Sequence, residues 1–114
     1  MEENTCFVSL SIEECGRLLF DAVVGGSITG ELIDHYTARG PGGLCCAVMV
    51  FEKHYYRAGN RLTLTVTLDN LLGRTRAHFI GGGGGEGLFR FDWGAAEDFA
   101  DVAAEALRPY MTEP

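Results

Sequence analysis

The sequence has 114 residues, of which 46% are hydrophobic and 22% are charged. This length and composition are typical of one globular domain and exclude an intrinsically disordered chain. The formal net charge of −7 makes nucleic acid a poor partner, because its phosphates repel an acidic chain at long range. We therefore expect a single domain over residues 1–114 and no nucleic-acid partner.

The chain shows no sign of export or membrane insertion. Glu2 and Glu3 stand where a signal peptide would carry basic residues. The longest apolar run, Leu44–Phe51, is far too short to span a bilayer. None of the four cysteines has C-x-x-C spacing, so free thiols are expected and no metal or other cofactor is implied. These features predict a cytoplasmic protein.

A strand followed by a capped helix is expected at the N-terminus. Cys6–Leu10 reads as a short strand, and Ser11 with Glu14 forms a capping box at the start of a helix. Apolar residues then recur at helical spacing up to Val23. Gly25 and Gly26 are expected to end this helix in the left-handed conformation.

A series of strands is expected next. Residues 27–39 form a less regular strand with Ile28, Leu32 and Tyr36 on one face, and residues 40–43 form a turn. Residues 44–57 form the strongest strand, whose first half is apolar on both faces. Such a strand is either covered on both faces within the sheet or contacts a partner chain.

The second half of the chain is expected to add three strands and a closing helix. Residues 61–69 alternate between leucine or valine and threonine, which is typical of a half-buried antiparallel strand. Residues 74–80 and 88–93 read as further strands, and residues 95–108 as a helix with Phe99, Ala103, Leu107 and Tyr110 directed inward. We expect Trp93 to lie in the core beneath this helix.

Together these elements predict an α+β fold. Short loops favour an antiparallel, meander-like sheet of five to six strands, with one helix near each terminus packed on one face of the sheet. The expected order is β-α-β-β-β-β-β-α.

Two stretches resemble a known family. They are residues 50–66 (VFEKHYY and then NRLTLTV) and the glycine run followed by FRFDWGA at residues 89–95. The chain resembles a bacterial family of small, uncharacterised proteins classed as a domain of unknown function. The resemblance implies a compact cytoplasmic domain and brings no reaction, cofactor or catalytic residue.

The five glycines at 81–85 are the most unusual feature of the sequence. Backbone amides of such a loop can bind phosphate, which makes Gly82, Gly83, Gly84 and Gly85 candidate ligands. A Walker loop would also contain Gly-Lys-Ser or Gly-Lys-Thr, and a dinucleotide loop would lead directly into a helix. A hairpin, a bulge or a close backbone approach explains the run equally well.

A polar sheet face is the second candidate site. Its members are expected to suit an anionic small molecule and are His54, Tyr56, Thr65, Arg76, His78 and Arg90. The same face can instead be solvated or can contact a second copy of the chain. Residues 39–90 carry a net charge of +4 (seven basic and three acidic residues), so the rest of the chain carries −11. This asymmetry favours pairing between copies.

Nothing in the sequence identifies a catalytic motif. Cys45 or Cys46 with His54 or His78 would form a thiolate pair only if the fold brought them together. His35, His54 and His78 lack the spacing of metal ligands on one element. The function expected is therefore a non-enzymatic interaction module acting as a homodimer. The alternative is a protein that binds a small anion between sheet and helices or on the polar face.

Overall fold

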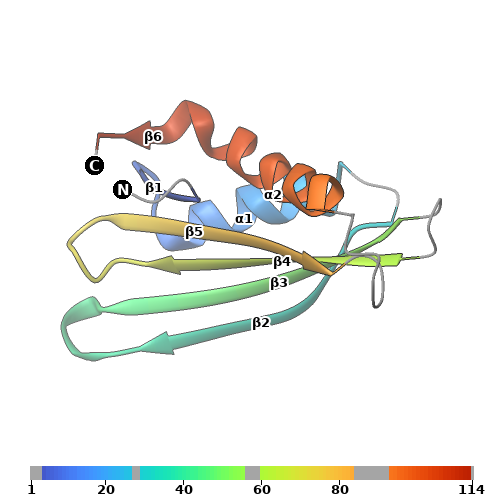
Figure 1. Ribbon diagram of the computed structural model, residues 1–114. Coiled ribbons are helices and arrows are strands. Elements are labelled where there is room, and N and C mark those ends of the chain that lie inside the picture. Colours follow the sequence, from blue (N-terminus) through green and yellow to red (C-terminus); the bar gives the residue numbers. More distant parts are fainter. Residues whose placement is uncertain (1–3, 27–28, 56–59, 84–92, 114) are drawn as a thin grey trace.

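The computed structural model describes residues 4–26, 29–55, 60–83 and 93–113. Figure 1 shows their arrangement as one sheet and two helices. In chain order the elements are β1 (Thr5–Val8), α1 (Ile12–Val23), β2 (Glu31–Arg39), β3 (Cys45–Tyr55), β4 (Asn60–Asp69), β5 (Thr75–Gly83), α2 (Trp93–Leu107) and β6 (Met111–Thr112). The predicted α+β class and the antiparallel sheet are confirmed.

The sheet has six strands in the order β2-β3-β4-β5-β1-β6, and every neighbouring pair is antiparallel. Strands β2 to β5 form the predicted meander, while β1 adds to the free side of β5. The two-residue strand β6 was not predicted, since its sequence carries no alternation. The strand predicted over residues 88–93 falls outside the described residues except at Trp93, where α2 begins.

Helix α1 has the predicted bounds and the predicted capping box. The Ser11 hydroxyl accepts a hydrogen bond from the Glu14 amide at 3.1 Å, and the Glu14 carboxylate accepts one from the Ser11 amide at 2.9 Å. These bonds favour the charged carboxylate and lower the pKa of Glu14. The buried face of α1 consists of Cys15, Leu19 and Val23.

The end of α1 differs from the prediction. Gly25 and Gly26 do not have positive φ; among the described residues only Gly42, Gly43, Gly73 and Gly83 do. Glycine is needed for space instead. A Cβ atom at Gly25 would lie 2.5 Å from the carbonyl oxygen of Asp21, and one at Gly26 would lie 2.7 Å from that of Ala22.

Alternate residues of β3, β4 and β5 form the inner face of the sheet. This face and both helices contribute side chains to a single core cluster. The largest fully buried members are Phe51, Leu19, Leu62, Leu64, Leu68 and Leu107. The remaining residues of these strands, among them Val48, Val50 and the threonines of β4, point to the opposite, outer face.

Helix α2 contributes Phe99, Ala103 and Leu107 to the core, as predicted. The inward position predicted for Tyr110 is wrong, since this residue is 37% exposed. The helix ends at Leu107, and Pro109 lies in a 3-10 turn that changes the direction of the following side chain. The side chain of Trp93 lies outside the described part of the chain.

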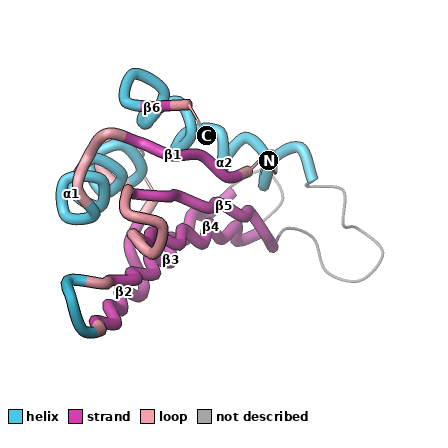
Figure 2. Tube along the Cα trace, turned by 90° about the vertical axis from the view of Figure 1, so that its left-hand side faces the viewer, coloured by secondary structure: helices cyan, strands magenta, loops and turns pink. Residues whose placement is uncertain are grey.

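Strand β2 forms one edge of the sheet, farthest from β1 and β6 (Figure 2). Its pairing with β3 is interrupted by a bulge, because Leu32 pairs with Phe51 and Asp34 with Val50, which leaves Ile33 unmatched. The bulge shifts the alternation by one residue. The prediction that Leu32 and Tyr36 share a face is therefore wrong: Leu32 lies on the inner face and Tyr36 on the outer face.

Candidate functional site

Four residues of the predicted polar face do lie on the outer face of the sheet. His54 comes from β3, Thr65 from β4, and Arg76 and His78 from β5. Tyr56 and Arg90 fall outside the described residues. Thr65 and His78 are close diagonal neighbours, because His78 pairs with Thr67.

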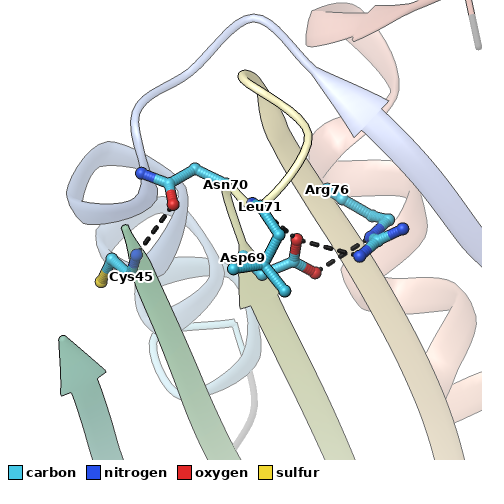
Figure 3. Close-up of polar contacts among 5 residues, drawn as sticks. All are labelled: Cys45, Asp69, Asn70, Leu71 and Arg76. Carbon is cyan, nitrogen blue, oxygen red and sulfur yellow. Dashed lines mark hydrogen bonds and ion pairs between the residues drawn. The ribbon is translucent and has the colours of Figure 1, made fainter. Parts of the chain in front are cut away.

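These four residues do not converge on one point. His54 pairs with Arg61 and Arg76 pairs with Asp69, at opposite ends of β4 and roughly 27 Å apart at about 3.4 Å per residue. The guanidinium of Arg76 is also already engaged, since its Nε and Nη2 donate to the two Asp69 oxygens at 3.0 and 3.1 Å (Figure 3). These bonds and the charge of Asp69 raise the pKa of Arg76.

The glycine run begins as part of the sheet. Gly82 and Gly83 belong to β5 and pair with Thr63 and Leu62 of β4. A Cβ atom at Gly83 would lie 2.5 Å from the carbonyl oxygen of Arg61, so a close backbone approach accounts for this glycine. Gly84 and Gly85, the other two glycines of the phosphate-loop prediction, lie outside the described residues.

The candidate cysteines and histidines are divided between the two faces of the sheet. Cys45 lies on the inner face, whereas His54 and His78 lie on the outer face. Cys46 shares the outer face with His54, but eight residues of β3 separate them, roughly 27 Å. His35 lies on the inner face, so the three histidine rings do not surround one point. Burial raises the pKa of Cys15 to about 12, which keeps this thiol neutral and unreactive.

The structure instead forms a groove of about 730 Å³ between α1 and the edge of the sheet, which we call the α1–β2 groove. Ile12, Glu13, Gly16, Arg17 and Phe20 line it from α1, and Leu32, His35, Thr37 and Arg39 line it from β2. Its floor is the inner face of the sheet, with Cys45, Ala47, Met49 and Leu68. The volume lies within the range of small-molecule sites.

The bulge in β2 places a histidine and an arginine in this groove. Because the alternation shifts at Ile33, His35, Thr37 and Arg39 lie on the inner face, opposite Met49, Ala47 and Cys45, respectively. Without the extra residue, these three side chains would lie on the outer face. Arg39 Nη1 lies 4.0 Å from the Cys45 sulfur, at the floor of the groove.

One end of the groove is braced by Asn70, which follows β4. Its side-chain oxygen accepts a hydrogen bond from the Cys45 amide at 2.8 Å, and its side-chain nitrogen donates to the Gly43 carbonyl at 3.0 Å. Figure 3 shows Asn70 reaching from the β4–β5 turn to the start of β3. These bonds join the β2–β3 turn to the β4–β5 turn and hold Cys45, the partner of Arg39, in place.

Replacing Asn70 with alanine is expected to lower the free energy of unfolding by about 1–3 kcal/mol, because the Cys45 amide loses its acceptor. Equilibrium denaturation in urea measures this loss. Asn70→Asp is the matched control, since it keeps the acceptor for Cys45 and loses only the donor to Gly43. An alanine variant no less stable than the aspartate variant would contradict the importance of the Cys45 bond.

Sequence reasoning missed Arg17, His35 and Arg39. Arg17 lies on the polar side of α1, where a solvent-exposed position is the ordinary expectation. His35 and Arg39 reach the groove only because of the bulge, which no local sequence pattern predicts. The excess of basic residues in 39–90 indicated a positively charged region, but it did not identify which of these residues would line the groove.

Comparison with known proteins gives one match. Residues 1–111 match the family described as "Family of unknown function (DUF6054)". No curated protein and no solved structure matches the chain. In the part of the chain that the structure describes, neither helix has the length and apolar character needed to cross a membrane. A match over nearly the whole chain shows that this protein belongs to the DUF6054 family of unknown function.

Proposed function

We propose that this protein is a non-enzymatic binding protein that holds a small organic anion in the α1–β2 groove. The observation that supports this most directly is the state of two arginines. Arg17 and Arg39 both line the groove, and neither has a carboxylate within 4.0 Å among the described residues. An arginine side chain beside an apolar floor is a ready partner for a carboxylate or a similar anion.

The other basic side chains have partners. Seven of the nine lysines and arginines lie in the described residues, all but Arg57 and Arg90. Three of the seven form ion pairs: Arg61 with Glu52, Arg76 with Asp69 and Arg108 with Glu105. Apart from Arg17 and Arg39, this leaves two, and both contact aromatic rings: Arg74, which also lines the groove, lies 3.8 Å from the Phe7 ring centroid, and Lys53 lies 5.9 Å from that of Phe99. Arg74 also donates to the Glu113 carbonyl.

Arg17 and Arg39 therefore differ electrostatically from Arg61, Arg76 and Arg108, whose charges are offset by short ion pairs. Arg17 contributes to lowering the pKa of Glu14 through its charge, but it makes no short ion pair with that carboxylate. Within the described residues, the side-chain hydrogen bond recorded for Arg39 goes to the sulfur of Cys45, at 4.0 Å. The net charge of −7 repels anions at long range, so binding depends on these local positive charges rather than on the field of the whole protein.

The proposal is tested with the fluorescent anion 1-anilinonaphthalene-8-sulfonate, which combines a sulfonate with aromatic rings. We expect saturable binding to the folded protein, and at least a tenfold weaker Kd for the Arg17→Gln, Arg39→Gln double variant. The matched control is Arg61→Gln, Arg108→Gln, which removes the same charge from two ion pairs outside the groove. Far-ultraviolet circular dichroism and melting curves confirm that both variants are folded.

Two results would contradict the proposal. One is equal weakening in the two double variants, which would show a general effect of net charge. The other is unchanged binding in the Arg17→Gln, Arg39→Gln variant, which would place the dye elsewhere. Native mass spectrometry of the freshly purified protein complements the titration, because a retained organic anion would appear as a discrete added mass.

A second candidate function is self-association through the outer sheet face. Tyr36 is 63% exposed and Ile80 is 54% exposed on this face, and the half-buried Val48 and Val50 lie between them. Exposed apolar and β-branched residues on a sheet suit packing against a second sheet. The same native mass spectra test this homodimer, and a monomer as the sole species at micromolar concentration would contradict it.

A cytoplasmic location forms part of the proposal. It is supported by Cys6, Cys15, Cys45 and Cys46, all of which are free thiols. Free cysteines are typical of proteins that act in a reducing compartment.

A further inference from the structure

The α1–β2 groove has a polar end and an apolar end. Helix α1 begins at the end of the sheet where Asn70 contacts Cys45, and Arg39 pairs with Cys45 at that same end. Glu13 lies in the first turn of α1 there. Arg17 follows one turn further along, and His35 lies four residues back along β2 from Arg39. The charged and polar groups therefore extend from Arg39 to His35, and Phe20 and Leu32 lie beyond them.

The other end of the groove is apolar. Phe20 comes seven residues after Glu13 along α1, roughly 10 Å at 1.5 Å per residue. On the opposite wall, Leu32 precedes the bulge and pairs with Phe51. Met49 lies in the floor between the two ends, and a Cβ atom at Gly16 would lie only 3.6 Å from its sulfur, so α1 runs directly above it. Phe20 is 40% exposed, so a ligand can reach its ring.

The charge of the groove indicates the charge of its occupant. Among the lining arginines and carboxylates, Arg17, Arg39 and Arg74 contribute +3 and Glu13 contributes −1, so these side chains carry a formal charge of +2. Arg74 is already engaged by the Phe7 ring and the Glu113 carbonyl, so Arg17 and Arg39 are the two lining arginines that remain for an anionic head group. A carboxylate suits these two arginines, because it accepts charge-assisted hydrogen bonds from guanidinium groups.

We propose that the ligand is an aliphatic carboxylate. Its carboxylate lies between Arg17 and Arg39, and its alkyl chain lies over Met49 toward Phe20 and Leu32. This inference rests on the proposed function, since it assigns the chemical class of the anion held in the same groove. The polar end fixes the head group through charge-assisted hydrogen bonds, and the apolar end adds affinity for each methylene removed from water.

The inference is tested by displacing 1-anilinonaphthalene-8-sulfonate with butyrate, hexanoate, octanoate and decanoate, below the concentrations at which they form micelles. We expect the Kd to fall about threefold for each added methylene. Decanol, which has the same chain without the charge, is expected to bind at least tenfold more weakly than decanoate.

Two variants separate the head group from the chain. Arg17→Gln, Arg39→Gln is expected to raise the Kd of all four acids by a similar factor and to leave the dependence on chain length unchanged. Phe20→Ser is expected to reduce the gain from octanoate to decanoate while butyrate binding stays the same. Arg61→Gln, Arg108→Gln again serves as the control for net charge.

The outcomes distinguish this inference from the function on which it rests. If butyrate and decanoate bind equally while dye binding still depends on Arg17 and Arg39, the anion site stands and the aliphatic class is wrong. If decanol competes as well as decanoate, the carboxylate is not recognised and the inference is also wrong. If the dye itself binds independently of both arginines, the proposed function fails first.

Discussion

Replacing Phe51 with alanine is expected to lower the free energy of unfolding by about 3–5 kcal/mol. Phe51 lies on the inner face of β3 and is fully buried. It belongs to the core cluster to which both helices contribute. Removing its ring leaves a cavity that neighbours on β4 and both helices cannot fill without moving. Denaturation in guanidinium chloride, followed by circular dichroism at 222 nm, measures the loss.

The matched control is Phe20→Ala. Phe20 is 40% exposed on α1 and lies outside the core cluster, so the same truncation there removes less buried surface and is expected to cost clearly less than Phe51→Ala. A domain of this size has a total stability of about 5–15 kcal/mol, so the Phe51 variant loses a large share of it. A loss below about 1 kcal/mol for Phe51→Ala would contradict the assignment of the inner face as the core.

The parts of the fold that could be predicted depend on local patterns. The start and the buried face of helix α1 were predicted, because Ser11 and Glu14 mark its start and the spacing of Cys15, Leu19 and Val23 marks its buried face. Strand β4 was equally clear, since leucine or valine alternates with threonine along it. In both elements each residue's neighbours along the chain determine its environment.

Other parts depend on contacts that a local pattern does not encode. The bulge at Ile33 is visible only in the pairing of β2 with β3. Strand β6 has two residues and is defined by its pairing with Phe7 and Val8 of β1. Strand β5 continues through Gly81, Gly82 and Gly83. Glycine disfavours strand structure, but here the pairing with β4 extends the strand.

The candidate site belongs to the second group. Arg76 and His78, two members of the predicted polar face, lie on the outer face of the sheet. The sequence could not show that Arg76 is paired with Asp69, because their contact requires the register of β4 with β5. Nor could it bring Arg17 and Arg39 to one groove, since that depends on the position of α1 over the sheet and on the bulge.

The second large effect is expected at Gly83, at the end of β5. This residue has a φ of +85°, and a Cβ atom there would lie 2.5 Å from the carbonyl oxygen of Arg61. A left-handed backbone conformation alone costs a non-glycine residue about 1–2 kcal/mol. The contact adds to this cost because a backbone carbonyl within the β4 ladder cannot move aside. We expect Gly83→Ala to lower the free energy of unfolding by more than about 2 kcal/mol.

Gly42 supplies a control that separates the two causes. Its φ of +71° is close to that of Gly83, but a Cβ atom there would meet nothing within 4 Å. Gly42→Ala is therefore expected to cost about 1 kcal/mol, from the backbone conformation alone. Urea denaturation of both variants gives the contribution of the Arg61 contact as the difference between them. Equal losses would show that this contact is relieved at no cost. A larger loss for Gly83→Ala would show that the close packing of β4 and β5 requires glycine at this position of the glycine run.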